Sequence, residues 1–554
     1  MELVLIGLSG SGKSSLSRAL AERTTAELLD LDSEIERRAG RSIEAIFAAG
    51  DEAAFRSLEG SVVAELAGDP ADARPGLRRV IAAGGGTVLD PANRWLLFRG
   101  RRVAWLDAPT EVLAARVRDG RQAERPLLSG GSVAERLAAQ LVGRERFYAA
   151  GERIPAGERP EAVLERLVAL TADGERREAQ TGTRLLDART HLGRIVLGAG
   201  IVETGVGEVL RELGARRVAL LSEPVAWRLH AERLAAVLTE GGITVEPLLL
   251  PRGERAKSLR VLERTLRELA RRRIERGDPV VAVGGGALGD VAGLVAATYL
   301  RGVPLVAVPT TLLAQLDASI GGKSAVDLPE GKNLVGTFRQ PAGIVIDVAL
   351  LATLPPRQVR AALGEAVKMA VLGEERLLAR LEAFGPSLAR SPRAAVASGA
   401  LAEVVERAAW AKVEIVLADE QEALGAAGRI RLNLGHSLGH AIEAAAGYRG
   451  ILHGEAVAHG LRGAFAVGRA IGLTPRARAE RIEALLDRLG LALAAPRVRP
   501  EAVMEHLAAD KKTAGGRLRW VLPTADGVTV RSDVPDDAVA QGLAAALGAR
   551  GGRR

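Results

Sequence analysis

The chain has 554 residues, of which 47% are hydrophobic and 26% charged, so it is long enough for two or three domains with separate cores. It contains no cysteine, which excludes a disulfide framework and thiolate metal sites. The net charge of +8 is spread along the chain without a basic tail or interleaved aromatic residues, which favours small anionic substrates over nucleic acid.

The chain enters a predicted strand at once, with no signal segment and no apolar run of membrane-spanning length. We therefore expect a cytoplasmic protein without a membrane partner. The apolar run Leu3–Ile6 leads into Gly-Leu-Ser-Gly-Ser-Gly-Lys-Ser at 7–14, which matches the phosphate-loop pattern in full. A helix is predicted from Ser15 onward. In this strand–loop–helix context backbone N–H groups cradle phosphates, Lys13 neutralises them and Ser14 can bind Mg²⁺.

Charged residues next to predicted strand ends indicate what kind of molecule accepts the transferred phosphate. Asp30 and Asp32 end the second predicted strand, where one could hold Mg²⁺ through water and the other could bind an acceptor hydroxyl. A triple-glycine turn at 84–86 follows the next strand. The cations nearby in sequence are Arg56, Arg125 and Arg144. One arginine alone is usually a solvated surface residue, but several beside strand ends and glycine turns favour a carboxylated acceptor, because the guanidinium group matches a carboxylate with two hydrogen bonds.

With these motifs, residues 1 to about 170 resemble shikimate kinase, a small phosphate-loop kinase with a parallel sheet. The resemblance implies ATP-dependent phosphorylation of shikimate to shikimate 3-phosphate, with Mg²⁺ bound together with ATP. It places the nucleotide on Gly10, Gly12, Lys13, Ser14 and Ser15, and the magnesium on Ser14 and Asp30. It places shikimate on Asp32, Arg56, Gly85, Gly86 and Arg144, and gives Lys13, Asp32 and Arg125 catalytic roles.

Residues 173–184 are polar and lack hydrophobic periodicity, which predicts a linker after a first domain at 1–172. A frayed helical extension of the first domain is the alternative. The two halves of the chain show no internal repeat, so the sequence indicates a fusion of different domains.

The second region begins with alternating strands and helices, typical of an α/β nucleotide-binding fold. The strand at 279–283 ends in the glycine turn Gly284–Gly286 before a helix, where a dinucleotide pyrophosphate can sit. This turn is not the usual G-x-G-x-x-G and is weak evidence alone. Lys323 and Lys332 follow nearby, and clustered lysines favour a phosphorylated substrate, although solvent exposure is the commoner fate of lysine.

From about residue 350 the pattern becomes helical, and three of the seven histidines fall in one short window. His436 and His440 are four residues apart and share a helix face, and His453 could reach the same point from the next loop. Converging imidazoles favour a divalent ion of the zinc type. Satisfied core histidines or a surface pair are the alternative. The best candidate for an anionic ligand is Glu365, three residues before Lys368 in an apolar run, and the substrate is expected in a cleft between the two halves.

Residues from about 185 to 545 resemble 3-dehydroquinate synthase, which implies an α/β NAD-binding half at 185–350 and an all-helical metal- and substrate-binding half at 351–554. The resemblance makes Glu365, His436 and His453 the ligands of Zn²⁺ or Co²⁺ and makes His440 an active-site residue that is not a ligand. The implied NAD contacts are Glu254, Lys257, Gly285, Gly286, Asp290, Thr310, Thr311, Lys332 and Thr353. The implied substrate and catalytic positions are Asp317, Lys323, Asn333, Lys368, Lys412, Arg429, Asn433, Lys511 and Lys512.

The implied reaction converts 3-deoxy-D-arabino-heptulosonate 7-phosphate to 3-dehydroquinate and phosphate, with NAD⁺ taking up a hydride and returning it, in a homodimer formed through this region. Two alternatives remain at this point. An NAD-dependent polyol dehydrogenase of similar architecture would release NADH and would not need a set of cations for a phosphate. Another sugar-phosphate cyclase would need no site for a substrate carboxylate.

Overall fold

The computed structural model describes residues 1–66, 76–119, 132–172, 182–425, 428–491, 496–513 and 518–548, with the backbone alone for 509–513. These residues form two compact units, 1–190 with 194–205, and 191–193 with 206–554. Most of the predicted linker lies outside the described residues, and strand β6 (Thr183–Thr190) begins within its last two positions. No helix in the described ranges is both long enough and apolar enough to cross a membrane.

The first unit contains a parallel five-stranded sheet in the order β2-β3-β1-β4-β5. Strand β1 lies in the middle and is buried along its whole length, as its continuous apolar sequence predicts. The strands of this unit are β1 (Glu2–Ile6), β2 (Glu27–Asp30), β3 (Arg79–Ala82), β4 (Arg102–Asp107), β5 (Glu152–Pro155), β6 and β7 (Gly193–Ala199). The helices are α1 (Lys13–Thr24), α2 (Leu31–Ala39), α3 (Ile43–Ala48), α4 (Glu52–Leu66), η1 (Thr87–Leu89), α5 (Pro91–Phe98), α6 (Thr110–Asp119), α7 (Val133–Tyr148) and α8 (Pro160–Ala172).

The second predicted strand is shorter than expected. Strand β2 ends at Asp30 because the Asp30 carboxylate caps helix α2, accepting a hydrogen bond from Ser33 N at 3.2 Å. Asp32 therefore lies in the first turn of α2 and not at a strand end, which corrects the sequence prediction for this residue.

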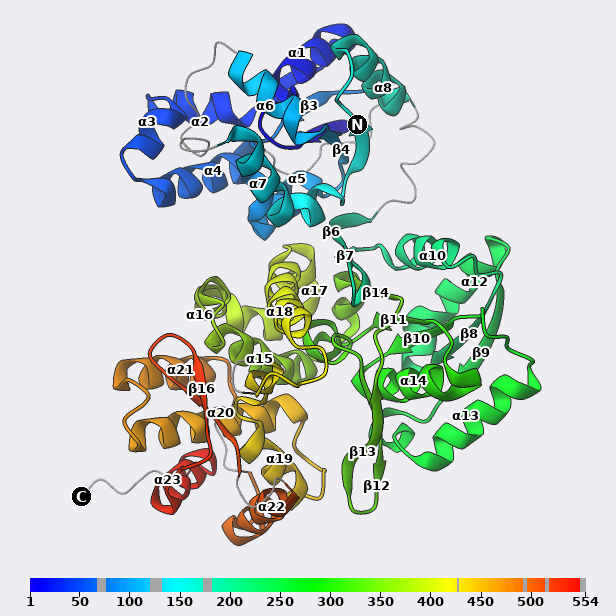
Figure 1. Cartoon of the computed structure of the whole chain (residues 1–554), viewed down its shortest axis with the longest axis vertical. Coiled ribbons are helices and arrows are strands. Elements are labelled where there is room, and N and C mark those ends of the chain that lie inside the picture. The colour runs from blue at the N-terminus through cyan, green and yellow to red at the C-terminus, as the bar shows by residue number, and fades with distance from the viewer. Residues whose placement is uncertain are drawn as a thin grey trace. The chain divides into compact units, whose positions relative to one another are not determined.

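The second unit begins with the predicted α/β half, which Figure 1 shows in green. Its parallel strands follow the order β14-β11-β10-β8-β9. An antiparallel hairpin, β12–β13, extends away from this sheet (Figure 1). The strands are β8 (Arg217–Ser222), β9 (Thr244–Leu249), β10 (Val280–Gly284), β11 (Leu305–Pro309), β12 (Lys323–Leu328), β13 (Gly331–Phe338) and β14 (Gly343–Asp347). The helical segments are α10 (Val202–Glu212), which spans the boundary between the units, α11 (Pro224–Ala226), η3 (Trp227–Ala231), α12 (Glu232–Glu240), η4 (Gly253–Ala256), α13 (Leu259–Arg271), α14 (Gly286–Thr298), η5 (Tyr299–Arg301), η6 (Ala314–Ala318) and η7 (Val348–Thr353).

Among the described residues of its C-terminal half, the second unit is helical, as predicted, apart from one short antiparallel hairpin. This hairpin, β15 (Trp520–Pro523) with β16 (Val528–Arg531), corrects the expectation of an all-helical half. The helices are α15 (Pro356–Val371), α16 (Glu375–Arg390), α17 (Pro392–Ala397), α18 (Ala400–Ala418), η9 (Arg429–Asn433), α19 (His436–Ala445), α20 (His453–Ala470), α21 (Arg476–Arg488), α22 (Pro500–Thr513) and α23 (Asp536–Ala546). Helix α20 packs against α15, α19 and α23 and so forms the centre of this half.

Candidate functional sites

The phosphate loop of the first unit turns through left-handed backbone at Gly10 and Gly12, with φ of 82° and 88°. A Cβ atom at Gly10 would lie 2.6 Å from the Leu113 carbonyl oxygen, so only glycine fits there. Lys13 begins α1, and its Nζ donates to the carbonyl oxygens of Gly7 at 2.8 Å and Leu8 at 2.9 Å. The amino group is thus held over the loop. The other predicted residues here, Ser14 and Ser15, form the first turn of α1.

The glycine turn at 84–86 is the point at which the predicted acceptor residues meet. A Cβ atom at Gly84 would lie 2.7 Å from Asp32 Oδ1, and one at Gly86 would lie 2.8 Å from Arg56 Nη2. Arg144 Nη1 donates to the Gly85 carbonyl oxygen at 3.0 Å. A Cβ atom at Gly85 would also lie 3.5 Å from the Gly7 carbonyl oxygen, so the turn adjoins the phosphate loop. One carboxylate and two guanidinium groups therefore surround a turn beside the phosphate site.

Two residues that hold this arrangement were not singled out from the sequence. Glu59 is buried, pairs with Arg56 at 2.8 Å and accepts a hydrogen bond from Thr87 Oγ1 at 2.7 Å. The Tyr148 hydroxyl donates to the Gly85 carbonyl oxygen at 2.6 Å. Burial raises the pKa of Tyr148 to about 12, so the hydroxyl stays protonated and remains a donor. The predicted lid residue Arg125 lies outside the described residues.

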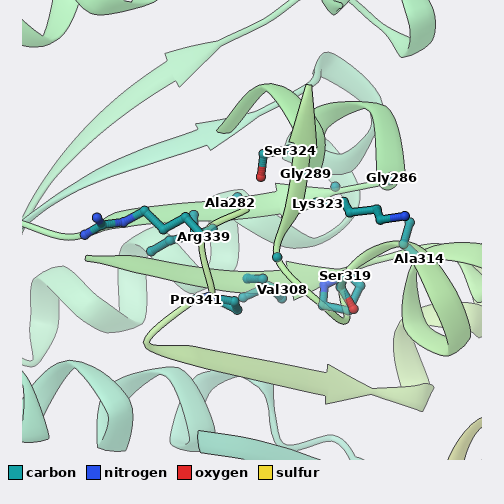
Figure 2. A pocket seen from close by; sticks show the side chains of 17 residues that line it. Ala282, Gly286, Gly289, Val308, Ala314, Ser319, Lys323, Ser324, Arg339 and Pro341 are labelled. Atoms are coloured by element: carbon teal, nitrogen blue, oxygen red, sulfur yellow. The ribbon is translucent and has the colours of Figure 1, made fainter. Parts of the chain in front are cut away.

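In the second unit, a pocket opens at the ends of β10 and β11 (Figure 2). Gly285 is the N-cap of helix α14 and Gly286 is its first residue, so the backbone N–H groups of the helix start face the pocket region. A Cβ atom at Gly285 would lie 3.3 Å from Thr311 Cγ2, so a larger residue there would press on the Thr311 side chain. Lys323 also lines the pocket, and Figure 2 shows its side chain extending away from Arg339. A glycine turn, a helix start and a cation are the elements that a dinucleotide pyrophosphate needs.

Other predicted cofactor residues form polar contacts within this α/β half. Lys257 Nζ pairs with Asp290 Oδ2 at 2.6 Å and also contacts Asn333 Oδ1. Lys332 Nζ lies 3.4 Å from Glu254 Oε2.

Two further predicted cofactor residues, both threonines, lie apart from these lysine contacts. Thr310 N donates to the Gly284 carbonyl oxygen at 2.9 Å, and Thr353 Oγ1 lies 3.2 Å from His230 Nε2.

The three histidines come together in the helical half, where one nitrogen from each lies within 4.8 Å of the others. Glu365 is fully buried, and its Oε1 lies 3.5 Å from His436 Nε2 and 3.3 Å from His453 Nε2. This oxygen has no hydrogen-bond partner among the described residues. The opposite nitrogens of both rings are engaged, since His436 Nδ1 lies 3.1 Å from the Leu434 carbonyl oxygen and His453 Nδ1 lies 3.0 Å from Glu443 Oε2. Two Nε2 atoms and one bare carboxylate oxygen therefore converge, whereas His440 is exposed.

The charges around the convergence of Glu365, His436 and His453 favour binding of a cation. Burial alone would raise the pKa of Glu365, but Lys368 and the two histidines hold it well below its usual range. Burial would lower the pKa of His453, but the carboxylates of Glu365 and Glu443 raise it to about 10. Lys368 Nζ pairs with Glu365 Oε2 at 2.5 Å, as residues three positions apart on one helix face can. The donor set of two imidazole nitrogens and one carboxylate oxygen suits an ion of the zinc type.

Backbone-to-backbone contacts between helices place these ligands. A Cβ atom at Gly454 in α20 would lie 1.9 Å from the Ala361 carbonyl oxygen in α15, and one at Gly364 would lie 2.3 Å from the Gly454 carbonyl oxygen. The sequence neighbours of these two glycines are His453 and Glu365. The absence of side chains at the crossing thus allows the two candidate ligands to approach each other.

We expect Gly454→Ala to lower the free energy of unfolding by about 1–3 kcal/mol or more, because the added methyl group meets backbone that cannot rotate away. The same change should weaken metal binding by moving His453 away from Glu365. Denaturant unfolding and zinc titration of the full chain measure both effects. Gly207→Ala is the control, since a Cβ atom at Gly207 in α10 meets nothing within 4 Å. A Gly454→Ala protein as stable as wild type would contradict the close crossing.

Cations predicted to bind substrate surround the metal site. Asp317 Oδ1 lies 2.8 Å from Lys412 Nζ and 3.8 Å from Lys368 Nζ. Burial would raise the pKa of Asp317, but these two lysines lower it to about 2. The carboxylate thus bridges two buried ammonium groups and fixes them next to Glu365.

A second acidic residue, Glu422, was missed by sequence reasoning. Its Oε2 pairs with Lys323 Nζ at 2.6 Å, and its Oε1 lies 3.5 Å from Asn433 Nδ2. Arg429, which follows Glu422 in the sequence, is buried. Its Nη1 donates to the Glu420 carbonyl oxygen at 2.8 Å. Glu422 therefore holds two of the predicted substrate-binding side chains. The side chains of Lys511 and Lys512 lie outside the described residues.

Comparison with known families divides the chain in the same way. Residues 9–171 match the family model described as shikimate kinase. Residues 247–361 match the N-terminal part of 3-dehydroquinate synthase, and residues 362–513 match its C-terminal part.

Individual relatives agree with these matches. A 3-dehydroquinate synthase of Symbiobacterium thermophilum is 43% identical over 356 residues, which cover 63% of this chain and 97% of that protein. The structure of ValA, a 2-epi-5-epi-valiolone synthase from Streptomyces hygroscopicus subsp. jinggangensis with NAD⁺ and Zn²⁺ bound, is 28% identical with a TM-score of 0.58 and covers 64% of this chain and 97% of that one. A 2-deoxy-scyllo-inosose synthase complexed with carbaglucose-6-phosphate, NAD⁺ and Co²⁺ is 25% identical with a TM-score of 0.57, and covers 66% and 99%.

Proposed function

Because the chain belongs to the 3-dehydroquinate synthase family and carries a shikimate kinase domain before it, we propose that the residues described above form two active sites, one in each unit. The chain is a bifunctional enzyme with shikimate kinase and 3-dehydroquinate synthase activities. The match to 3-dehydroquinate synthase sets aside both alternatives, a polyol dehydrogenase and a different cyclase.

In the kinase, the phosphate loop with Gly10, Gly12, Lys13, Ser14 and Ser15 holds the ATP phosphates, and Ser14 and Asp30 hold Mg²⁺. Asp32, Arg56, Gly85, Gly86 and Arg144 hold shikimate at the glycine turn. The adjacency of this turn to the loop supports the assignment, because the acceptor hydroxyl must lie in line with the transferred phosphate. Lys13 and Arg125 stabilise charge on that phosphate, and Asp32 orients the hydroxyl.

In the synthase, we assign Glu365, His436 and His453 as ligands of Zn²⁺ or Co²⁺. Glu365 Oε1, which faces both Nε2 atoms and has no hydrogen-bond partner among the described residues, is the observation that carries this assignment. A bound ion would act as a Lewis acid on a substrate oxygen. His440 lies on the same helix face and is assigned to the substrate and not to the ion, since its ring is exposed and the family resemblance makes this position an active-site residue that is not a ligand.

The remaining residues bind and orient. Lys323, Lys368, Lys412, Arg429 and Asn433 supply positive charge and donors for the phosphate, carboxylate and hydroxyl groups of a heptulosonate phosphate, with Asp317, Asn333, Lys511 and Lys512. NAD is assigned to the pocket at Gly285 and Gly286, with Glu254, Lys257, Asp290, Thr310, Thr311, Lys332 and Thr353. The glycine turn at the start of α14 supports this placement.

An assay of the heptulosonate phosphate with limiting NAD tests the synthase assignment. We expect release of phosphate over many turnovers per NAD molecule without net accumulation of NADH, because the hydride is returned. The absorbance of NADH and the released phosphate are followed together. Stoichiometric NADH without phosphate would contradict the cyclase and favour the dehydrogenase alternative.

The proposal also includes domains at 1–172, 185–350 and 351–554, with a linker at 173–184. We further propose that the protein forms a homodimer through the synthase region, binds small molecules as its partners, and is located in the cytoplasm.

A further inference from the structure

Glu443 in helix α19 lies on the same helix face as two of the histidines. It follows His440 by three residues and His436 by seven, so all three side chains point to the same side of the helix. The carboxylate is buried, and its Oε2 lies 3.0 Å from His453 Nδ1. None of the assigned substrate, cofactor or metal positions includes Glu443.

The contact occupies one nitrogen of His453 and leaves the other for an ion. When Nδ1–H donates to Glu443, Nε2 is the nitrogen left to bind an ion, and this atom lies 3.3 Å from Glu365 Oε1. The Leu434 carbonyl oxygen does the same for His436, at 3.1 Å from Nδ1. Histidines that bind metals commonly donate their second N–H to a carboxylate or carbonyl, which fixes the tautomer and the ring orientation.

The other carboxylate oxygen faces the α/β half. Glu443 Oε1 lies 4.0 Å from Lys332 Nζ, which in turn lies 3.4 Å from Glu254 Oε2 and 4.4 Å from the ring centre of Tyr448. Lys332 belongs to β13 of the hairpin that extends from the nucleotide-binding half. A single carboxylate thus contacts a candidate metal ligand with one oxygen and a candidate cofactor residue with the other.

We propose that Glu443 is a positioning residue that holds His453 in the tautomer required for metal binding and links it to Lys332 on the β12–β13 hairpin. This inference rests on the proposed metal site. Loss of such an outer partner typically weakens metal affinity by about 10–100-fold.

The first test compares zinc affinity, by competition with a chelator, in the full chain. Glu443→Ala is expected to weaken binding by about 10–100-fold and to alter the visible spectrum of the Co²⁺ form, because the ring is no longer oriented. Glu443→Gln should lose less, since its amide oxygen still accepts from Nδ1–H. Glu455→Gln is the matched control: it removes one negative charge near the start of the same helix as His453 but contacts Arg357 and Leu452 N. Its affinity should stay within about twofold of wild type.

The second test addresses the link. Lys332→Met should weaken zinc binding by about threefold in the wild-type background and leave it unchanged when Glu443 is already alanine, because interacting residues are not additive. Equal effects in both backgrounds would overturn the link. Wild-type zinc affinity and an unchanged Co²⁺ spectrum in Glu443→Ala and Glu443→Gln would overturn the positioning role. A wild-type chain that binds no zinc would instead refute the proposed metal site.

Discussion

Replacing His453 by alanine is expected to remove most of the bound metal and to reduce cyclisation to background, whereas replacing His440 by alanine should leave the metal in place and slow turnover. His453 Nε2 faces the bare Glu365 oxygen, and losing one of three protein ligands leaves too few bonds. The loss should exceed the roughly 10–100-fold effect of losing an outer partner. Metal analysis and phosphate release, measured on both variants, check this.

Chelation gives the corresponding control without a mutation. It should abolish cyclisation and spare shikimate phosphorylation once Mg²⁺ is supplied in excess, and Zn²⁺ or Co²⁺ should restore cyclisation. A His440→Ala protein that loses the ion while His453→Ala keeps it would show that the ligand assignment is wrong.

Lys13→Ala is expected to reduce phosphoryl transfer to shikimate by about 10²–10³-fold, comparable to the loss of one preorganised donor at a site of developing charge. The amino group lies over the phosphate loop, held by the carbonyl oxygens of Gly7 and Leu8. The synthase reaction should be unaffected. Steady-state kinetics of both reactions on one preparation provide the measurement.

Arg18→Ala is the matched control, because it removes an exposed cation from the same helix α1 without touching the loop. It should retain kinase activity. Kinase turnover in Lys13→Ala equal to that of Arg18→Ala would rule out the phosphate-loop assignment.

The sequence predicted most fully those features that depend on local backbone. The phosphate loop is one continuous motif, and its left-handed glycines and helix start appear where expected. The spacing of His436 and His440 likewise predicted a shared helix face. Strand β2 was predicted too long, because the capping contact of Asp30 that ends it lies in the side chain and not in the hydrophobic pattern.

Features built from distant segments were harder to predict. Spacing favoured His440 as a ligand. The apolar run around Glu365 made it a candidate ligand, but spacing could not show that it reaches His453, which it does because α15 and α20 touch at Gly364 and Gly454. Glu422 was missed because its partner Lys323 lies 99 residues away. Glu443 was not predicted as a site residue, although its position seven residues after His436 places it on the same helix face.

The position of the ion in crystals of the metal-loaded chain tests the account most directly. Anomalous scattering from bound Zn²⁺ or Co²⁺ should give one peak bonded to Glu365 Oε1 and to Nε2 of His436 and His453, at about 2.0–2.2 Å, with His440 beyond bonding distance. The three histidines also have nitrogens within 4.8 Å of one another, so they form the competing ligand set. A peak bonded to all three histidines and not to Glu365 would contradict the proposed site.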